Sequence, residues 1–188
     1  MDDVYQRVLH RAKPLGNHAR KHLRAIERHG QLLTTRLDET GGLSQVPLEH
    51  ATPAIAEALR QVSHAGRDEG ECLTLIGTYY GIQYLHMCSR ELERLAMDLA
   101  ERPGRRQAYR SFLRRTEEEF TSLISAYIRR ALRILMPSAL GSSFVICAVG
   151  TRGHQDDLDV AVIDDGGNDR KQIDRVIGRL TVQMVRYA

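Results

Sequence analysis

The sequence contains no tryptophan, and aromatic residues make up only 5% of its 188 residues. Single-stranded nucleic acids are held largely by aromatic side chains on which the bases stack, so the chain has little material for such a platform. No apolar run approaches the length that spans a bilayer, and the N-terminal stretch MDDVYQRVLHRAK lacks the apolar core of a signal peptide. We therefore expect a cytoplasmic protein with no membrane partner.

Cysteine is also scarce. Cys72, Cys88 and Cys147 are odd in number, widely spaced and set in apolar surroundings. This pattern excludes a disulfide framework and does not have the spacing of a zinc site. We expect three reduced thiols in the core.

Neither half of the chain carries a strong excess of one charge. There are 27 basic and 24 acidic residues, and the formal net charge of +3 divides into +4 over residues 1–137 and −1 over residues 138–188. A polybasic arm for nucleic acid is therefore absent from the sequence. Hydrophobic residues make up 42% and charged residues 27%, which is ordinary for a globular protein and excludes general disorder.

What the sequence does contain is helical periodicity, which runs through most of residues 1–137. The clearest segment is 105–136, where apolar residues recur at steps of three and four opposite a charged face. These apolar residues are Tyr109, Phe112, Leu113, Phe120, Leu123, Ile124, Tyr127, Ile128, Leu132 and Leu135. Pro103 and Gly104 precede this helix and Pro137 follows it, as is usual at helix ends.

A second long helix is predicted over residues 68–102. It is apolar on several sides, so we expect it to lie at the centre of a bundle, and the small pair Gly77 and Gly81 would let a neighbouring helix approach closely. Upstream, Thr52 is suited to cap a short helix with Pro53 at its first position, and residues 38–47 form a loop. Residues 1–137 therefore predict an antiparallel bundle of about four or five helices, with a regulatory or interaction role.

One candidate metal site in the bundle fails on its residue types. His18 and His22 are four residues apart and would share a helix face, but zinc proteases with that spacing need a glutamate beside the first histidine, where Ala19 stands. His10 and His29 complete the set, and all four lie among arginine and lysine, which would repel a cation. We interpret this region as a solvated basic face.

After Pro137 the pattern changes. The stretches SSFVICAVG and DLDVAVID are continuous apolar runs of the kind that buried strands show, and the residues from 166 onward return to helical spacing. We expect two paired strands within residues 143–164, followed by a helix.

Two carboxylates stand at the start of the second strand. Asp157 and Asp159 are two residues apart, so in a strand they project to the same side, a few ångströms from one another. Adjacent carboxylates repel unless a cation lies between them, and hard oxygen ligands at this spacing suit Mg²⁺ or Mn²⁺. The sequence therefore predicts a metal site at Asp157 and Asp159.

The turn before the carboxylates has the parts of a phosphate-binding loop. Gly150 and Gly153 offer backbone N–H groups without obstruction by a Cβ atom, and Thr151 and Arg152 add a hydroxyl and a guanidinium. Metal-holding carboxylates beside a phosphate cradle indicate phosphoryl or nucleotidyl transfer. The alternative is a solvated hairpin whose aspartates protect a sheet edge.

The stretch VGTRGHQDDLDVAVI resembles the signature of the DNA polymerase β-like nucleotidyltransferase superfamily, in which a hydrophobic strand and a Gly-Ser turn precede an Asp-x-Asp motif on a second strand. The Gly-Ser-x-Gly-Arg form of the nucleotidyltransferases related to PII-protein uridylyltransferases is the nearest. In this correspondence Gly150 and Gly153 match the two glycines, Thr151 stands in place of the serine, and His154 stands in place of the arginine.

The resemblance covers about residues 144–187, and within it Asp157 and Asp159 match the two metal-binding carboxylates. It implies Mg²⁺-dependent transfer of a nucleoside monophosphate from a nucleoside triphosphate to a protein or small-molecule acceptor, in the setting of signal transduction. The fold class we expect is mainly α: a helical bundle over 1–137, followed over 138–188 by a partial α/β nucleotidyltransferase-like unit of two strands and a helix.

The family also takes a third carboxylate from a later strand. The remaining acids after the motif, Asp164, Asp165, Asp169 and Asp174, fall beyond the second strand or on the last helix. We therefore expect the catalytic domain to be incomplete in this chain: either it continues beyond the chain, or the chain is a shortened and inactive relative. In both cases we expect little transferase activity from the chain by itself.

Two other functions compete with this one. The first is a non-catalytic regulatory module, a helical bundle that binds a protein partner or a second copy and carries a degenerate nucleotide site. The second is nucleic-acid binding through the arginine doublets at 105–106, 114–115 and 129–130. Such doublets more often form a solvated, ion-paired helix face, so we do not expect a nucleic-acid partner.

Overall fold

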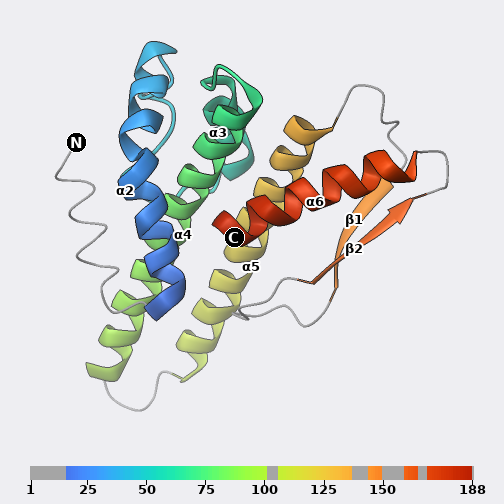
Figure 1. Cartoon of the computed structure of the whole chain (residues 1–188). Helices are drawn as coiled ribbons and strands as arrows, with labels where there is room; N and C mark the ends of the chain where they lie inside the picture. Colours follow the sequence, from blue (N-terminus) through green and yellow to red (C-terminus); the bar gives the residue numbers. More distant parts are fainter. Residues whose placement is uncertain (1–15, 101–105, 137–143, 150–158, 165–168, 188) are drawn as a thin grey trace.

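The computed structural model describes residues 16–100, 106–136, 144–149, 159–164 and 169–187. Within these ranges the chain forms five helices and two strands (Figure 1). In chain order they are α2 (Gly16–Glu39), α3 (Ile55–His64), α4 (Glu69–Ala100), α5 (Arg106–Leu135), β1 (Phe144–Val149), β2 (Asp159–Asp164) and α6 (Arg170–Tyr187). The mainly helical class predicted from the sequence is confirmed. No helix in the described ranges is long and apolar enough to cross a membrane.

Helix α4 lies at the centre of the bundle, as its apolar residues on several sides predict. It packs against α2, α3, α5 and α6, and Figure 1 shows α2 and α5 running along it. Its buried apolar side chains are Leu73, Leu75, Ile76, Tyr79, Tyr80, Ile82, Leu85 and Met87. Because they point to more than one side, each neighbouring helix finds an apolar surface on α4.

Helix α5 buries one stripe, as its periodicity predicts. Leu123, Tyr127, Ala131 and Leu135 recur every fourth residue and are buried against α3 and α4, whereas Arg129 is exposed on the opposite face. The side chains of the predicted apolar residues at 109, 112 and 113 lie outside the described part.

Two predicted boundaries near α3 and α2 are wrong. Helix α3 begins at Ile55, and Thr52 is not its N-cap: the Thr52 hydroxyl accepts a hydrogen bond from the Ala54 N–H at 3.2 Å, while the Thr52 N–H donates to Gln83 of α4 at 3.0 Å. This bond to α4 holds residue 52 in the turn before the helix. Helix α2 runs to Glu39, so the first two residues of the predicted loop at 38–47 are helical.

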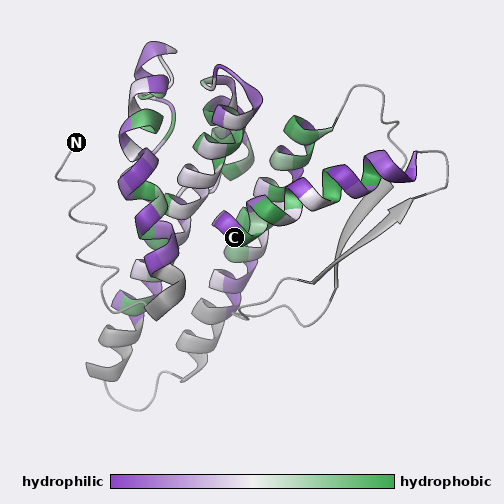
Figure 2. Ribbon diagram, viewed as in Figure 1, coloured by the Kyte–Doolittle hydropathy of each residue, from purple (hydrophilic) through white to green (hydrophobic). Residues whose placement is uncertain are grey.

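Helix α6 joins the core of the bundle. Its residues Ile173, Val176, Leu180 and Tyr187 are buried in the same apolar cluster as the side chains of α2 to α5. Figure 2 shows hydrophilic and hydrophobic turns alternating along α6, as a helix with one buried side requires. The boundary that we predict at residue 137 stays a prediction, but α6 shares its packing with the elements that precede that boundary.

The strands β1 and β2 pair antiparallel. In their register Phe144 lies opposite Asp164 and Val149 lies opposite Asp159. Figure 1 shows the pair outside the helical bundle, on the side away from α2. The nucleotidyltransferase-like character of this segment stays a prediction.

Two of the three glycines of α4, Gly77 and Gly81, are points of close approach to other helices. A Cβ atom at Gly77 would overlap the ring of Tyr187, and one at Gly81 would lie 3.2 Å from Nδ1 of His22. Gly77 therefore receives α6 and Gly81 receives α2, which extends the predicted role of this small pair to two neighbours. Both contacts bring large rings against the backbone of α4.

Substitution of Gly77 tests this contact. We expect Gly77→Ala to lower the free energy of unfolding by about 1–3 kcal/mol, because the new methyl group overpacks the site of Tyr187. Gly178→Ala on α6 is the matched control: a Cβ there meets nothing within 4 Å, so the variant should gain about 0.5–1 kcal/mol of helix propensity. Urea unfolding followed by circular dichroism measures both, and equal stability of the two variants would refute the contact.

Candidate functional site

Most of the predicted site lies outside the described residues. This holds for Gly150, Thr151, Arg152, Gly153, His154 and Asp157. Asp159 is the first residue of β2, and its backbone pairs with that of Val149. The metal and phosphate contacts of these residues therefore stay predictions.

The register of the strand pair nevertheless bears on the site. Val149 immediately precedes the glycine turn in sequence, and Asp159 is the second carboxylate of the motif. Because these two residues are partners in the pair, residues 150–158 join two neighbouring strand ends. The strand residues on either side of these positions, Val149 and Asp159, are therefore neighbours in the pair.

No group of three or more histidine, cysteine, aspartate or glutamate side chains within the described ranges could hold a metal ion.

The predicted solvated basic face is wrong at one position: His22 is fully buried. Its ring packs against Tyr84, with centroids 4.6 Å apart, and against Tyr80 at 5.7 Å. The sequence did not reveal this because Arg20 and Lys21 precede the histidine, whereas the surface that receives it is on α4.

A cavity of about 410 Å³ opens between the segment before α3, the middle of α4 and the middle of α5. Ile55, Met87 and Leu123 give it apolar walls, and charged side chains of α4 and α5 lie at its rim. At that rim Glu119 pairs with both Arg90 and Arg115. These charges satisfy one another, so the cavity selects no ligand by charge.

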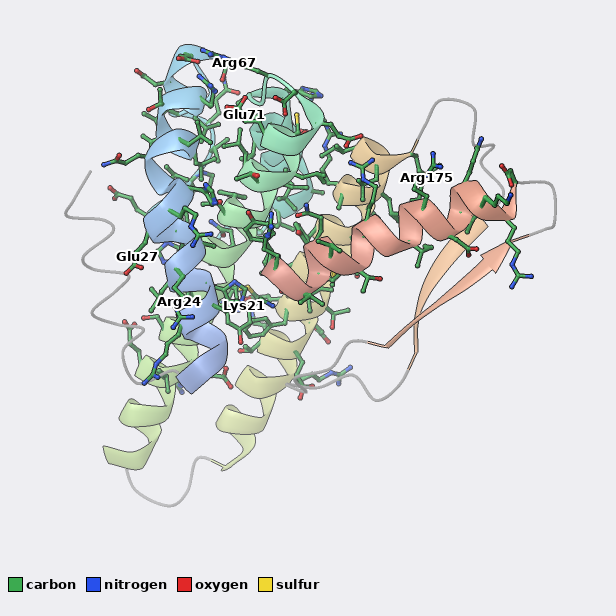
Figure 3. All side chains as sticks on the ribbon, viewed as in Figure 1. Lys21, Arg24, Glu27, Arg67, Glu71 and Arg175 are labelled. Atoms are coloured by element: carbon green, nitrogen blue, oxygen red, sulfur yellow. The ribbon has the colours of Figure 1, made fainter. Side chains whose placement is uncertain are left out.

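A half-buried ion-pair network connects α2 to α4 at one end of the bundle. Arg36 and Glu71 pair at 2.8 Å with 13% of each side chain exposed, and Arg67 pairs with Glu39 at 3.2 Å. Figure 3 shows Arg67 and Glu71 at this end. The hydrogen bond from Arg36 lowers the pKa of Glu71. The pair therefore stabilises the fold above the ordinary glutamate pKa, and this contribution is lost as the pH falls.

The arginine doublets of α5 do not behave alike. Arg114 and Arg115 pair with Glu118 and Glu119 four residues later, at 3.3 and 3.2 Å, so the predicted ion-paired face is confirmed for this doublet. For the doublet at 129–130, the sequence from 125 to 134 contains no acid. The lack of acids is a local signal that these arginines have no nearby partner on their own helix. It does not indicate the hydrogen bond that Arg130 donates to Ser63 of α3.

The chain matches no known family model, no curated protein and no solved structure. The superfamily named above is therefore a resemblance carried by the motif residues alone.

Cys72 and Cys88, whose side chains the structure describes, are free and only partly exposed. Burial raises the pKa of Cys72, helped by Asp68 and Glu71, and burial raises the pKa of Cys88 to about 11. Nucleophilic cysteines need a lowered pKa, because the thiolate is the reactive form. Neither thiol has the environment of a catalytic nucleophile.

Alkylation tests this conclusion. At pH 8 we expect Cys88 in the folded protein to react with iodoacetamide about 100-fold more slowly than in urea, because little thiolate forms below its raised pKa. The rate in the folded protein should still rise between pH 8 and pH 10. Peptide mass spectrometry separates Cys72 from Cys88, and equal rates in folded and unfolded protein at pH 8 would contradict the assignment.

Proposed function

We propose that this chain carries the nucleotide- and metal-binding part of a nucleotidyltransferase, which transfers a nucleoside monophosphate from a nucleoside triphosphate to a protein or small-molecule acceptor. The site is the end of the strand pair at Val149 and Asp159. The single observation that supports the proposal is the register of β1 and β2. It brings the strand end that leads into the glycine turn beside the strand end that starts with Asp159.

The donor set suits the group that the proposal requires. Asp157 and Asp159 are the ligands for Mg²⁺ or Mn²⁺, since carboxylate oxygens are the hard donors these ions take in proteins. When bound, the ion neutralises phosphate charge and polarises the phosphoryl group that is transferred. The side chains and backbone of the chain bind and orient the triphosphate.

The residues before the carboxylates have a positioning role. Gly150 and Gly153 allow the triphosphate to approach backbone N–H groups, and Thr151 and Arg152 donate further hydrogen bonds to phosphate oxygens. His154 stands where the family has an arginine, and its imidazole N–H donates a further hydrogen bond to a phosphate oxygen. These contacts orient the triphosphate for attack by an acceptor hydroxyl.

Metal titration tests the proposal. We expect the wild-type chain to bind Mn²⁺ weakly, and more tightly in the presence of ATP or UTP, because the triphosphate completes the coordination of the ion. The double variant Asp157→Asn/Asp159→Asn should bind Mn²⁺ about 10–100-fold more weakly. Asp164→Asn is the matched control, since it removes a carboxylate from the opposite end of the same strand. Isothermal titration calorimetry measures all three proteins.

A backbone variant separates the phosphate loop from the metal ligands. We expect Gly150→Val to weaken nucleotide binding while Mn²⁺ binding without nucleotide and the helical circular dichroism signal stay unchanged. The valine side chain would obstruct the approach of phosphate to the backbone but leave both carboxylates in place. Equal nucleotide binding by Gly150→Val and wild type would remove the glycine turn from the site.

A second candidate function is the non-catalytic interaction module, in which the helices bind a protein partner. One observation favours it: Val182 and Val185 of α6 are 58% and 72% exposed. They are three residues apart and so lie on the same side of the helix. If the double aspartate variant binds Mn²⁺ and nucleotide as wild type does, this second function takes the place of the first.

A further inference from the structure

Three arginines gather where α3 and α5 pack against one another. Arg60 is on α3, and Arg130 and Arg133 are one turn apart on α5. Arg60 and Arg133 are both close enough to act on the charge of Arg130. We call this group the arginine cluster.

Arg130 is held in place by a buried hydroxyl. Its Nε donates a hydrogen bond at 2.6 Å to Oγ of Ser63, whose residue is only 3% exposed. That hydroxyl in turn donates to the carbonyl of Arg60 at 2.7 Å. The guanidinium is therefore fixed at one corner, and its orientation relative to α3 is set by the fold.

The two Nη atoms of the same guanidinium make no such hydrogen bond within the described part of the chain. Among the described residues, Ser63 is the one hydrogen-bond partner of Arg130, through Nε, and no carboxylate pairs with Arg130 or Arg133. Arg60 does have a partner, since Glu57 binds it at 2.5 Å. The cluster thus combines three guanidinium groups with one carboxylate.

This arrangement is unfavourable without a counter-charge. A partly buried cation loses hydration, and like charges nearby add repulsion. Burial, followed by the charges of Arg133 and Arg60, lowers the pKa of Arg130. The arginines at 114 and 115 show the contrasting case, since each has a glutamate four residues later.

We propose that the arginine cluster binds the phosphate group of a small anionic ligand, with Arg130 as the fixed fork and the exposed Arg133 as the second donor. Guanidinium groups match phosphate oxygens with two parallel hydrogen bonds, and an anchored guanidinium loses little entropy when they form. The cluster is made of α3 and α5 alone, and does not rest on the proposed function of the strand pair.

The test uses inorganic pyrophosphate and the full chain, in low salt with EDTA to keep metal ions away from the carboxylate motif. We expect calorimetry to show binding to wild type, and Arg130→Gln and Arg133→Gln each to weaken it about tenfold or more, because each removes a charged hydrogen bond. Arg129→Gln is the matched control: it removes the same charge from an exposed neighbour on the same helix. It should bind within about twofold of wild type.

Three results would overturn the proposal. Absence of pyrophosphate binding by folded wild type would mean that the cluster is neutralised by the chain itself. Equal losses in Arg129→Gln and Arg130→Gln would reduce the site to unspecific positive charge. Loss of binding in Gly150→Val would assign the phosphate to the glycine turn, so that variant must bind pyrophosphate as wild type does. Arg133→Gln keeps the test valid if Arg130→Gln unfolds, since Arg133 makes no described hydrogen bond and is exposed.

Discussion

The fold depends on how closely large rings approach the backbone of α4. At Gly77 the ring of Tyr187 occupies the space of a side chain, and at Gly81 the ring of His22 lies 3.2 Å from the place of a Cβ atom. Both rings are almost completely buried, so each contact fixes the position of its helix along α4. Through Tyr187, the helix that follows the strand pair is attached to the bundle that precedes it.

The charged side chains that connect neighbouring helices differ from those of the arginine cluster, because they are paired. At the N-terminal end of α4 the charged side chains are paired: Arg36 with Glu71, and Arg179 of α6 with Glu69. These pairs connect neighbouring helices and leave little net charge behind. The arginine cluster on α3 and α5 departs from this pattern, which is why it points to a ligand and the paired networks do not.

Sequence reasoning succeeded where a pattern depends on a single helix. The stripe of α5 and the central position of α4 follow from periodicity, because one helix face must be apolar to pack at all. It failed where the outcome depends on a partner distant in sequence. Thr52 is drawn away from its capping role by Gln83, and His22 is buried because α4 offers a glycine and two tyrosine rings. Local charge around His22 predicts the opposite.

The candidate sites likewise depend partly on local sequence and partly on contacts between residues distant in sequence. The pairing of the strand that ends at Val149 with the one that starts at Asp159 connects the motif to one strand end, but the family resemblance adds the chemistry. The arginine cluster was beyond sequence reasoning, since Ser63 and Arg130 are 67 positions apart. Only the absence of acids around residue 130 gave a local indication, and it did not identify the partner.

The central claim is that a metal–nucleotide complex binds at the end of the strand pair and away from the helical core. Paramagnetic broadening by Mn²⁺ in the presence of ATP, recorded on the amide signals of the ¹⁵N-labelled chain, tests it most directly. Our account predicts that the signals of Val149 and Asp159 broaden first, while those of Phe144 and Asp164 at the other end of the strands broaden less. Broadening confined to the helices, or none at all, would contradict it.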